Sequence, residues 1–428
     1  MAYRLERGGY PYRADGDAAA GFATAARTLE ADYWYPYMEH AALEPMNCTA
    51  RFDAGRLELW APTQYADEGV RVAAHATGIP IERIKLHLTY IGGGFGRRIC
   101  NDYVSQAAQL AVQMPGVPIQ LLWSREETTR HGYYAAPAAG RFRGGLDRDG
   151  RLIAWSCRSV FAKKVDQSYA AARIPQTIPN VAVEFATVDS PVPFGWMRGV
   201  SITQFLWMNQ GFMDELAHAA GRDPLEFQLE LLDERALAAS WSDKEYELAR
   251  VRALRRVLQE AAARAAWGPA PAPGRGRGIA VSDFSYWSGY NTSATAAVAD
   301  VTLDADGWFK VDRVVVAMEC GVVINPDIVK AQLEGGVAWA LSTAMYSEIT
   351  LAGGRVEQGN FDDYPLLRIA QMPRVETHVL PSDKHPSGVG EVAVPVPIAA
   401  VVNAIYAAGG PRIRSLPIVR HKPLQRRV

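Results

Sequence analysis

The 428-residue chain has few of the features that mark metal-binding, nucleic-acid-binding or membrane-spanning proteins. Its four cysteines (Cys48, Cys100, Cys157 and Cys320) are scattered, and its eight histidines do not cluster. This spacing predicts buried thiols and argues against a disulfide framework, an iron–sulfur cluster or a zinc site. The net charge of −1 leaves no basic surface that would favour nucleic acid or an anionic membrane. No apolar run has the length of a membrane span, and the N-terminus lacks a signal-peptide core.

Apolar residues, by contrast, are plentiful. They make up 49% of the chain, which is enough to bury a large core in two or three domains. A Gly/Pro-rich stretch at 268–278 is the clearest linker. We expect the chain to divide there into a first lobe at 1–267 and a second lobe at 279–428. The predicted fold class is α+β.

The spacing of apolar residues predicts the individual elements. Strands should alternate with helices from 51 to 125, and 141–182 should be antiparallel β with a turn at 147–150. Helices are expected at 18–30, 102–114, 204–232 (in two parts), 240–267, 326–342 and 397–408, and strands at 84–89, 142–146, 152–158, 294–303 and 308–319.

The most informative segment is 90–98, with the sequence YIGGGFGRR, between an expected strand and an expected helix. Glycine lets backbone N–H groups approach a phosphate closely, and a helix N-terminus favours negative charge. Arg97 and Arg98 add fork-shaped donors suited to pyrophosphate. The loop predicts a site for a large, flat, phosphorylated group, and an ordinary strand–helix turn is the alternative. The residues expected to contact this group are Gly92, Gly93, Gly94, Phe95, Gly96 and Arg97.

Two familiar nucleotide loops do not fit this segment. A dinucleotide fingerprint that starts at Gly92 needs glycine at position 97, which is arginine, and an acidic ribose partner about 20 residues further on, which is missing. A Walker loop needs Gly-Lys-Ser/Thr, which does not occur. A nicotinamide-dependent dehydrogenase is therefore disfavoured.

Other segments add candidate ligand contacts. Glu391 follows a glycine-paired turn, and we expect it to be partly buried, as suits a general base; a solvated turn acid is the alternative. Arg198 and Gly199 precede a helix, where they either meet a ligand or lie on the surface. Paired glycines at 335–336 imply close approach by a backbone or a ligand. His40 is better explained as a satisfied core histidine.

Together these segments resemble the large subunits of molybdenum hydroxylases, the xanthine dehydrogenase and aldehyde oxidase family, in their order along the chain. The branch that looks most similar is that of the isoquinoline 1-oxidoreductase β subunits. The resemblance covers nearly all of 16–418. The stretches that carry it to this branch are 40–50, 60–64, 214–217, 221–227 and 412–417.

The resemblance implies a two-lobed molybdopterin-binding domain. Molybdenum would be held by the dithiolene of a pterin, often in its cytosine dinucleotide form, which implies no side-chain ligand to the metal. Glu391 matches the family's active-site base. The implied reaction hydroxylates an N-heterocycle or oxidises an aldehyde with water as oxygen source, and electrons leave through a small iron–sulfur subunit. Beyond the glycine loop, the implied cofactor contacts are Arg198, Gly199, Gln332, Gly335, Gly336, Ser387, Gly388, Val389 and Gly390. Apart from the resemblance, the aromatic side chains of Trp196, Tyr286, Trp287 and Tyr290 suit a flat substrate ring, and a place in the core is the alternative.

Departures from the family matter as well. The chain corresponds to little more than the C-terminal half of a usual large subunit and lacks that family's Glu-Met-Gly-Gln-Gly segment. Met38 stands where the xanthine dehydrogenase branch has a metal-facing Gln, and Glu319 where Asp is commoner. We therefore expect a split subunit, with a second chain supplying the front part. The compartment would be cytoplasmic, or periplasmic if a partner carries an export signal. A non-catalytic assembly module that binds no metal is the rival interpretation.

Overall fold

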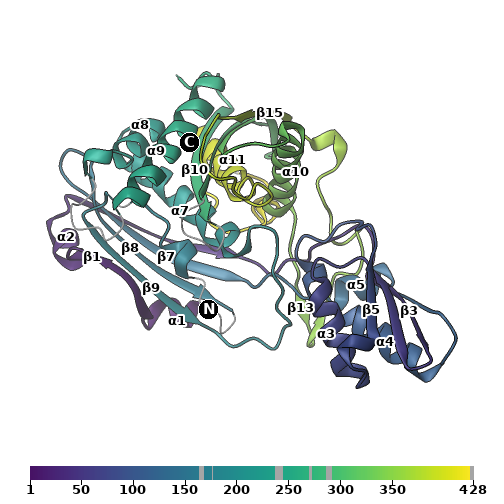
Figure 1. Cartoon of the computed structure of the whole chain (residues 1–428). Helices are drawn as coiled ribbons and strands as arrows, with labels where there is room; N and C mark the ends of the chain where they lie inside the picture. The colour runs from purple at the N-terminus through teal and green to yellow at the C-terminus, as the bar shows by residue number, and fades with distance from the viewer. Residues whose placement is uncertain (163–167, 176, 237–243, 269–271, 286–291, 425–428) are drawn as a thin grey trace.

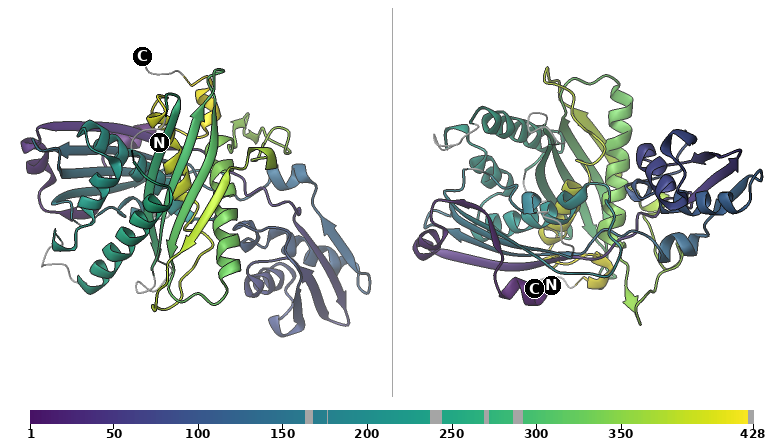
Figure 2. Two further views of the ribbon diagram at one scale, coloured as in Figure 1. Left: turned by 90° about the horizontal axis from the view of Figure 1, so that it is seen from above. Right: turned by 60° about the horizontal axis from the view of Figure 1, so that its bottom comes forward.

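The computed structural model describes residues 1–162, 168–175, 177–236, 244–268, 272–285 and 292–424. Two large sheets lie on either side of a central pair of helices, α7 (Val200–Ala219) and α11 (Pro395–Ala407), and a small α/β unit stands apart from them (Figure 1, Figure 2). The predicted α+β class is confirmed. No helix among the described residues is both long enough and apolar enough to cross a membrane.

The first large sheet has five strands in the order β1-β9-β8-β7-β2. β7 and β8 form the predicted hairpin about 147–150, but β9 runs parallel to β8, so the prediction of antiparallel structure through 182 is wrong. A parallel return needs a long crossover, and this one passes through α6 (Ser168–Ala171). The strands are β1 (Tyr10–Asp15), β2 (Arg27–Tyr35), β7 (Ala138–Leu146), β8 (Leu152–Phe161) and β9 (Asn180–Thr187).

The predicted helix at 18–30 is only half correct. α2 (Ala18–Thr24) ends early, and β2 begins at Arg27. The second half of β2 buries every second side chain, namely Ala31, Tyr33 and Tyr35, because a strand points alternate residues to opposite faces. A further short helix, α1 (Ala2–Glu6), precedes β1.

The second large sheet has the strand order β10-β11-β12-β15, with α9 (Lys244–Arg264) on one face and α11 on the other. Its strands alternate accordingly: Val298 packs toward α9, whereas Ala297 and Ala299 pack toward α11. The predicted β pair at 294–303 and 308–319 is confirmed. The strands are β10 (Arg275–Ser285), β11 (Thr292–Leu303), β12 (Phe309–Glu319) and β15 (Arg374–Val379).

The predicted linker is wrong at its C-terminal end, because β10 begins at Arg275. Gly276 and Gly278 lie against the backbone of α11, where an added Cβ would come within 2.1 Å of Ala404 O and 2.2 Å of Ala400 O. The glycines of this stretch therefore permit close packing of strand on helix. Residues 269–271 of the linker lie outside the described part of the chain. The division into two lobes stays a prediction, and the main core draws side chains from both sides of it.

The predicted helices of the central layers are confirmed. Asp223 caps α8 (Pro224–Leu231) by accepting from the N–H groups of Leu225 and Glu226, and Pro224 opens the helix as expected. α10 (Pro326–Met345) packs beside α11 and β15, and Asn325 caps it in the same way. Two short strands, β13 (Leu351–Ala352) and β14 (Arg355–Val356), form a separate hairpin.

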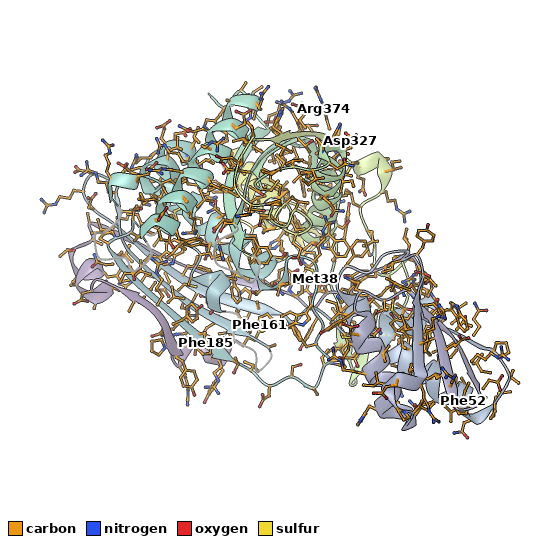
Figure 3. All side chains as sticks on the ribbon, viewed as in Figure 1. Met38, Phe52, Phe161, Phe185, Asp327 and Arg374 are labelled. Carbon is orange, nitrogen blue, oxygen red and sulfur yellow. The ribbon has the colours of Figure 1, made fainter. Side chains whose placement is uncertain are left out.

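The small unit lies between β2 and β7 in the sequence and has its own core. Strands and helices alternate in it as predicted, with α3 and α4 covering one face of a sheet in the order β5-β4-β3-β6. Met38 is fully buried and lies where this unit meets the two large sheets, whereas Phe52 lies at its far end (Figure 3). The elements are β3 (Asn47–Asp53), β4 (Arg56–Ala61), α3 (Ala66–Thr77), β5 (Ile84–Leu88), α4 (Asp102–Gln113), β6 (Ile119–Leu122) and α5 (Arg125–Arg130).

Candidate functional site

The guanidinium of Arg198 joins segments that are far apart in the chain. Its Nε donates to Gly390 O at 2.5 Å, and its Nη2 donates to Gln332 O at 3.1 Å and to Gln332 Oε1 at 3.2 Å. The backbone N–H of Arg198 donates to Phe95 O at 2.9 Å. The glycine loop, the start of α7, α10 and the turn before α11 therefore meet at one residue.

Glu391 lies beside this junction. It is half-buried in the bend that precedes α11. Its Oε1 accepts the backbone N–H of Gly199 at 3.1 Å, and Oε2 has no hydrogen-bond partner among the described residues. Gly199 adopts φ +89° at the start of α7, a conformation that favours glycine. The arrangement holds a carboxylate by one oxygen and leaves the other available to take up a proton.

The glycine loop packs against this junction and presents backbone donors. Gly96 has φ +109°, and an added Cβ would lie 1.7 Å from Trp196 O, so no side chain fits. Phe95 also has positive φ (+55°), and its ring lies 4.4 Å from that of Trp339 on α10. Within the described residues, the N–H groups of Gly93, Gly94 and Phe95 have no protein acceptor. Successive free N–H groups with alternating handedness form a concavity suited to an anion.

Arg97 and Arg98 differ from expectation, because both side chains are fully buried. Arg97 forms a two-pronged pair with Asp102, each N–O distance being 2.9 Å. Arg98 donates to Gly93 O at 2.8 Å and to Glu44 Oε2 at 2.9 Å. Both guanidinium groups are enclosed by the protein and bonded to it, so the prediction that they contact a pyrophosphate is corrected: they hold the loop in place.

Two residues that the sequence did not link to the loop also shape it. Glu44 Oε2 accepts the N–H of Gly92 at 2.7 Å, and Gln64 Oε1 accepts the N–H of Gly96 at 3.0 Å. These amides are therefore unavailable to an external phosphate. The only signal in the sequence was that both residues lie in the stretches, 40–50 and 60–64, that carry the family resemblance.

His40 and Glu39 lie behind the loop. His40 is fully buried, as predicted for a core histidine, and its Nε2 contacts Trp196 O at 2.8 Å. Burial lowers the pKa of His40 to about 4, so the ring is neutral. Burial raises the pKa of Glu39 to about 8, against the opposing effect of nearby Arg97. Both carboxyl oxygens of Glu39 lack a hydrogen-bond partner among the described residues.

Of the remaining predicted residues, some are exposed at the site and others are turned into the protein. Gln332 and Gly335 lie on an exposed face of α10, and Gly388 O accepts from Ser293 Oγ at 2.6 Å. Gly336 instead packs against Ala393 on the core side of α10, so the prediction that it contacts a ligand is corrected.

Ser387 donates its N–H to Cys320 O at 2.9 Å, and Val389 packs against the main core. Of the predicted substrate-side aromatics, Trp196 is partly exposed, and Tyr286, Trp287 and Tyr290 lie outside the described residues.

Charged side chains do not form a metal site in the described ranges: no group of three or more His, Cys, Asp or Glu is placed there to hold an ion. The site instead offers backbone N–H groups, one arginine, one exposed amide and one carboxylate. Such a set suits a flat, phosphorylated organic group next to an acid–base residue.

Comparison with known proteins adds a family. A family model described as a molybdopterin cofactor-binding domain matches residues 6–231, and a second with the same description matches residues 217–373. The chain is 27% identical over 396 residues to the beta subunit of isoquinoline 1-oxidoreductase from Brevundimonas diminuta, covering 88% of this chain and 48% of the relative. It is 29% identical over 447 residues to a nicotinate dehydrogenase subunit from Pseudomonas putida, covering 95% of this chain and 36% of the relative.

A solved structure has the same fold. Quinoline 2-oxidoreductase of Pseudomonas putida 86 superposes with a TM-score of 0.78 at 16% identity, over 97% of this chain and 78% of that one. The chain spans half or less of the length of these two curated relatives, 48% and 36%.

Proposed function

Because the chain belongs to the molybdopterin cofactor-binding domain family, we propose that it is the catalytic, cofactor-binding part of a multi-subunit oxidoreductase. The reaction proposed is hydroxylation of an N-heterocycle or oxidation of an aldehyde, with water as oxygen source. Relatives named as isoquinoline and nicotinate enzymes support an N-heterocycle as substrate, and relatives named as an aldehyde dehydrogenase and an aldehyde oxidoreductase support an aldehyde. The family resemblance predicted from the sequence is confirmed by the two family matches.

The observation that carries this proposal is the meeting of the Arg198 junction with Glu391. A scaffold that binds nothing has no need of a glycine loop with no room for a Cβ at Gly94 or Gly96, an arginine that links this loop to α10, and a half-buried carboxylate beside both. Their convergence from four segments therefore favours a working site over a non-catalytic module.

The residues present fit a pterin cofactor with phosphates. Gly93, Gly94 and Phe95 would donate their N–H groups to a phosphate or a ring carbonyl, because no protein group accepts them in the described structure. Gln332 and the surface of Gly335 would lie against the flat ring system, since both residues are exposed. When bound, the molybdenum cofactor, which we propose is the cytosine dinucleotide form, supplies the redox chemistry.

In this proposal Glu391 is the general base. Gly199 fixes Oε1, and Oε2 would remove the proton from the water-derived oxygen that attacks the substrate carbon. Arg198 keeps the turn before Glu391 in register with the glycine loop through its bond to Gly390 O. These groups bind and orient, and they place one proton acceptor at a defined position.

We also propose partners. A further polypeptide would correspond to the part of the relatives that this chain does not span, and a small iron–sulfur subunit would accept electrons. The cofactor-facing side of the chain is open, with Gln332, Gly335 and the glycine-loop residue Gly92 exposed, as expected if another chain completes the site.

The test is to measure molybdenum and cytidine nucleotide by mass spectrometry. The chain purified alone is compared with the chain co-expressed with its neighbouring open reading frames, in a host that makes the cofactor. We expect metal and nucleotide in the co-expressed complex. Their absence from a properly assembled complex would favour the non-catalytic assembly module.

A further inference from the structure

The segment that leads into α7 has no regular structure of its own. Residues 188–199, all of them described, link β9 to α7 without forming a helix or a strand. The position of this segment therefore depends on individual bonds to its neighbours. Two are backbone bonds: the N–H of Gly195 donates to Tyr134 O at 3.0 Å, and the N–H of Arg198 donates to Phe95 O at 2.9 Å. Between these two bonds lies the carbonyl of Trp196.

The carbonyl of Trp196 is held by a side chain, that of His40. The distance from His40 Nε2 to Trp196 O is 2.8 Å, and His40 is fully buried. Burial lowers the pKa of His40 to about 4, so the ring is neutral and carries one hydrogen. Because a carbonyl oxygen only accepts hydrogen bonds, that hydrogen is on Nε2 and Nδ1 has none.

The other ring nitrogen indicates that His40 does more than fill space in the core. His40 Nδ1 is buried and has no hydrogen-bond partner among the described residues. An unpaired buried polar atom costs stability, so an apolar side chain would serve a pure packing role better. What a histidine adds at this position is the bond from Nε2 to the carbonyl of Trp196.

The carbonyl of Trp196 lies in a tight place next to the proposed active site. A Cβ added to Gly96 would be 1.7 Å from Trp196 O, so the carbonyl packs directly on the glycine loop. Three residues further along the chain, Gly199 donates its N–H to Glu391 Oε1 at 3.1 Å. A displacement of the Trp196 carbonyl is therefore passed to the carboxylate through a short length of backbone.

We propose that His40 is a positioning residue whose Nε2–H group holds the carbonyl of Trp196 against the glycine loop. The fixed carbonyl sets the turn at 198–199, and this turn orients Glu391. The effect of His40 on turnover rests on the proposed function, in which Glu391 is the base. The hold of His40 on the segment does not rest on it.

Two substitutions that differ by one methylene group separate the bond from the packing. In His40→Gln the amide nitrogen is two bonds from Cγ, as Nε2 is in histidine, so it still donates to Trp196 O. In His40→Asn the amide nitrogen is one bond from Cγ, as Nδ1 is, and it falls short of the carbonyl. The control is Ser159→Ala, which removes a bond of the same kind elsewhere: Ser159 is 2% exposed, and its Oγ donates to Glu184 O at 3.1 Å in the first large sheet.

The first experiment observes the segment itself, without an activity assay. Amide hydrogen exchange of peptides that cover 195–199 is measured by mass spectrometry on the full chain. In His40→Asn we expect exchange of the amides at 198 and 199 to be about tenfold faster than in the wild type, because the segment opens more readily. His40→Gln and Ser159→Ala should keep the wild-type rate there. Wild-type exchange in His40→Asn, or equally fast exchange in His40→Asn and His40→Gln, would overturn the proposal.

A spectrum of the unaltered chain tests the donor directly. Nuclear magnetic resonance of isotope-labelled histidine shows which ring nitrogen carries the hydrogen. For His40, whose signal is the one absent from His40→Gln, we expect a neutral ring with the hydrogen on Nε2. A ring that carries its hydrogen on Nδ1 would overturn the proposal whatever the exchange rates are.

The second experiment tests the positioning role in the assembled, cofactor-loaded complex. His40→Asn should lower kcat about tenfold with little change in KM, because only the orientation of the base is lost, and His40→Gln should restore most of the rate. Ser159→Ala should lower the unfolding midpoint and leave kcat unchanged. Wild-type kcat in His40→Asn would overturn the positioning role. A wild-type complex that carries the cofactor but does not turn over contradicts the proposed function instead, and the exchange experiment then still decides whether His40 holds the segment.

Discussion

The backbone N–H of Gly199 donates to Glu391 Oε1 at 3.1 Å, although the two residues are 192 positions apart in the chain. The bond joins the start of α7 to the turn before α11, the two helices that pack against each other between the large sheets. The central helix pair of the fold therefore sets the position of the proposed base.

Removing the base should separate catalysis from cofactor binding. Glu391→Gln keeps the shape of the side chain and an oxygen that accepts from Gly199, but it loses the proton acceptor. We expect normal molybdenum and nucleotide content with turnover lowered about 10²–10⁴-fold. The measurements are metal analysis and kcat on the same preparation. Wild-type turnover in a fully loaded variant would remove Glu391 from the mechanism.

The glycine loop should tolerate no side chain at Gly96. Gly96→Ala places a Cβ 1.7 Å from Trp196 O and forces alanine to φ +109°. We expect a lower unfolding midpoint together with loss of cofactor from the assembled complex, because Trp196 closely precedes the Arg198 turn. The matched control is Gly78→Ala, which also has positive φ (+72°) but no neighbour within 4 Å. The Gly78→Ala variant should lose only the free energy of backbone strain, about 1–2 kcal/mol, and should keep its full cofactor content.

Glu39 should make stability depend on pH. Burial raises the pKa of Glu39 to about 8, whereas an unfolded glutamate has a pKa of about 4.3. Between these values the folded state holds a proton on Glu39 that the unfolded state has lost. The contribution of Glu39 to the free energy of unfolding is therefore most favourable below about pH 4.3 and falls as the pH rises toward 8. Arg97 and Arg125 oppose the shift but do not cancel it.

The isosteric variant Glu39→Gln removes this titration. Its free energy of unfolding in urea should exceed that of the wild type at pH 8 by an amount on the order of 5 kcal/mol, and the two should converge near pH 4. If the free energies of unfolding of the wild type and the variant differ by the same amount at every pH in this range, Glu39 does not titrate as the structure indicates.

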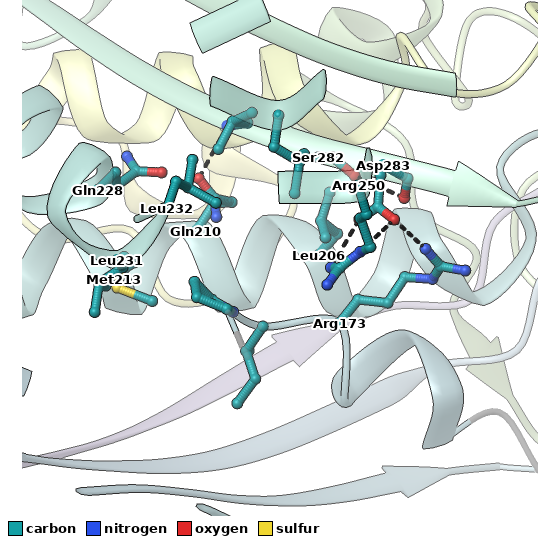
Figure 4. Close-up of a pocket in the computed structure, with 14 residues that line it drawn as sticks. Arg173, Leu206, Gln210, Met213, Gln228, Leu231, Leu232, Arg250, Ser282 and Asp283 are labelled. Atoms are coloured by element: carbon teal, nitrogen blue, oxygen red, sulfur yellow. Dashed lines mark hydrogen bonds and ion pairs between the residues drawn. The ribbon is translucent and has the colours of Figure 1, made fainter. Parts of the chain in front are cut away.

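The buried charge cluster that lines the cavity in Figure 4 should be needed for stability. Asp283 accepts from Arg250 at 2.7 and 3.0 Å and from Arg173 at 2.5 Å. Burial alone would raise the pKa of Asp283, but the two guanidinium groups outweigh it and lower the pKa to about 2. Asp283→Asn removes the carboxylate that the two guanidinium groups share, although Arg250 keeps its contact with Glu247 at 3.2 Å. Breaking a buried pair in this way costs about 3–5 kcal/mol. The measurement is the free energy of unfolding.

Asp233→Asn is the control for this cluster. Asp233 also pairs with an arginine, Arg235, but that arginine is 91% exposed. Water screens the pair, so the substitution should leave the unfolding transition almost unchanged. If the free energy of unfolding falls by a similar amount in both variants, burial does not set the strength of the cluster.

Several features could be predicted because their causes are local. The strand at 84–88, the glycine loop and α4 follow from apolar spacing within about thirty residues. The hairpin about 147–150 follows from its turn residues. Pro224 and Asn325 mark helix starts through bonds made within one turn.

Other features could not be predicted because distant partners decide them. Arg97 and Arg98 resemble ligand donors until Asp102 and Glu44 are seen to occupy them. The glycines at 276 and 278 resemble a linker until α11, more than a hundred residues later, is found packed on them. Gly336 resembles a ligand contact until Ala393 is found to cover it.

The sequence by itself determined the class of the fold, the family and the identity of the candidate base, since these depend on residue type, order and local periodicity. Only the tertiary structure decided which donors remain free. A hydrogen-bonding group pairs with any partner that the packing of the chain places within about 3 Å of it. Here those partners come from distant parts of the sequence. The N–H groups of Gly93 to Phe95 that stay free among the described residues, the bonds made by Arg198 and the bond from Gly199 to Glu391 are consequences of packing that no local pattern contains.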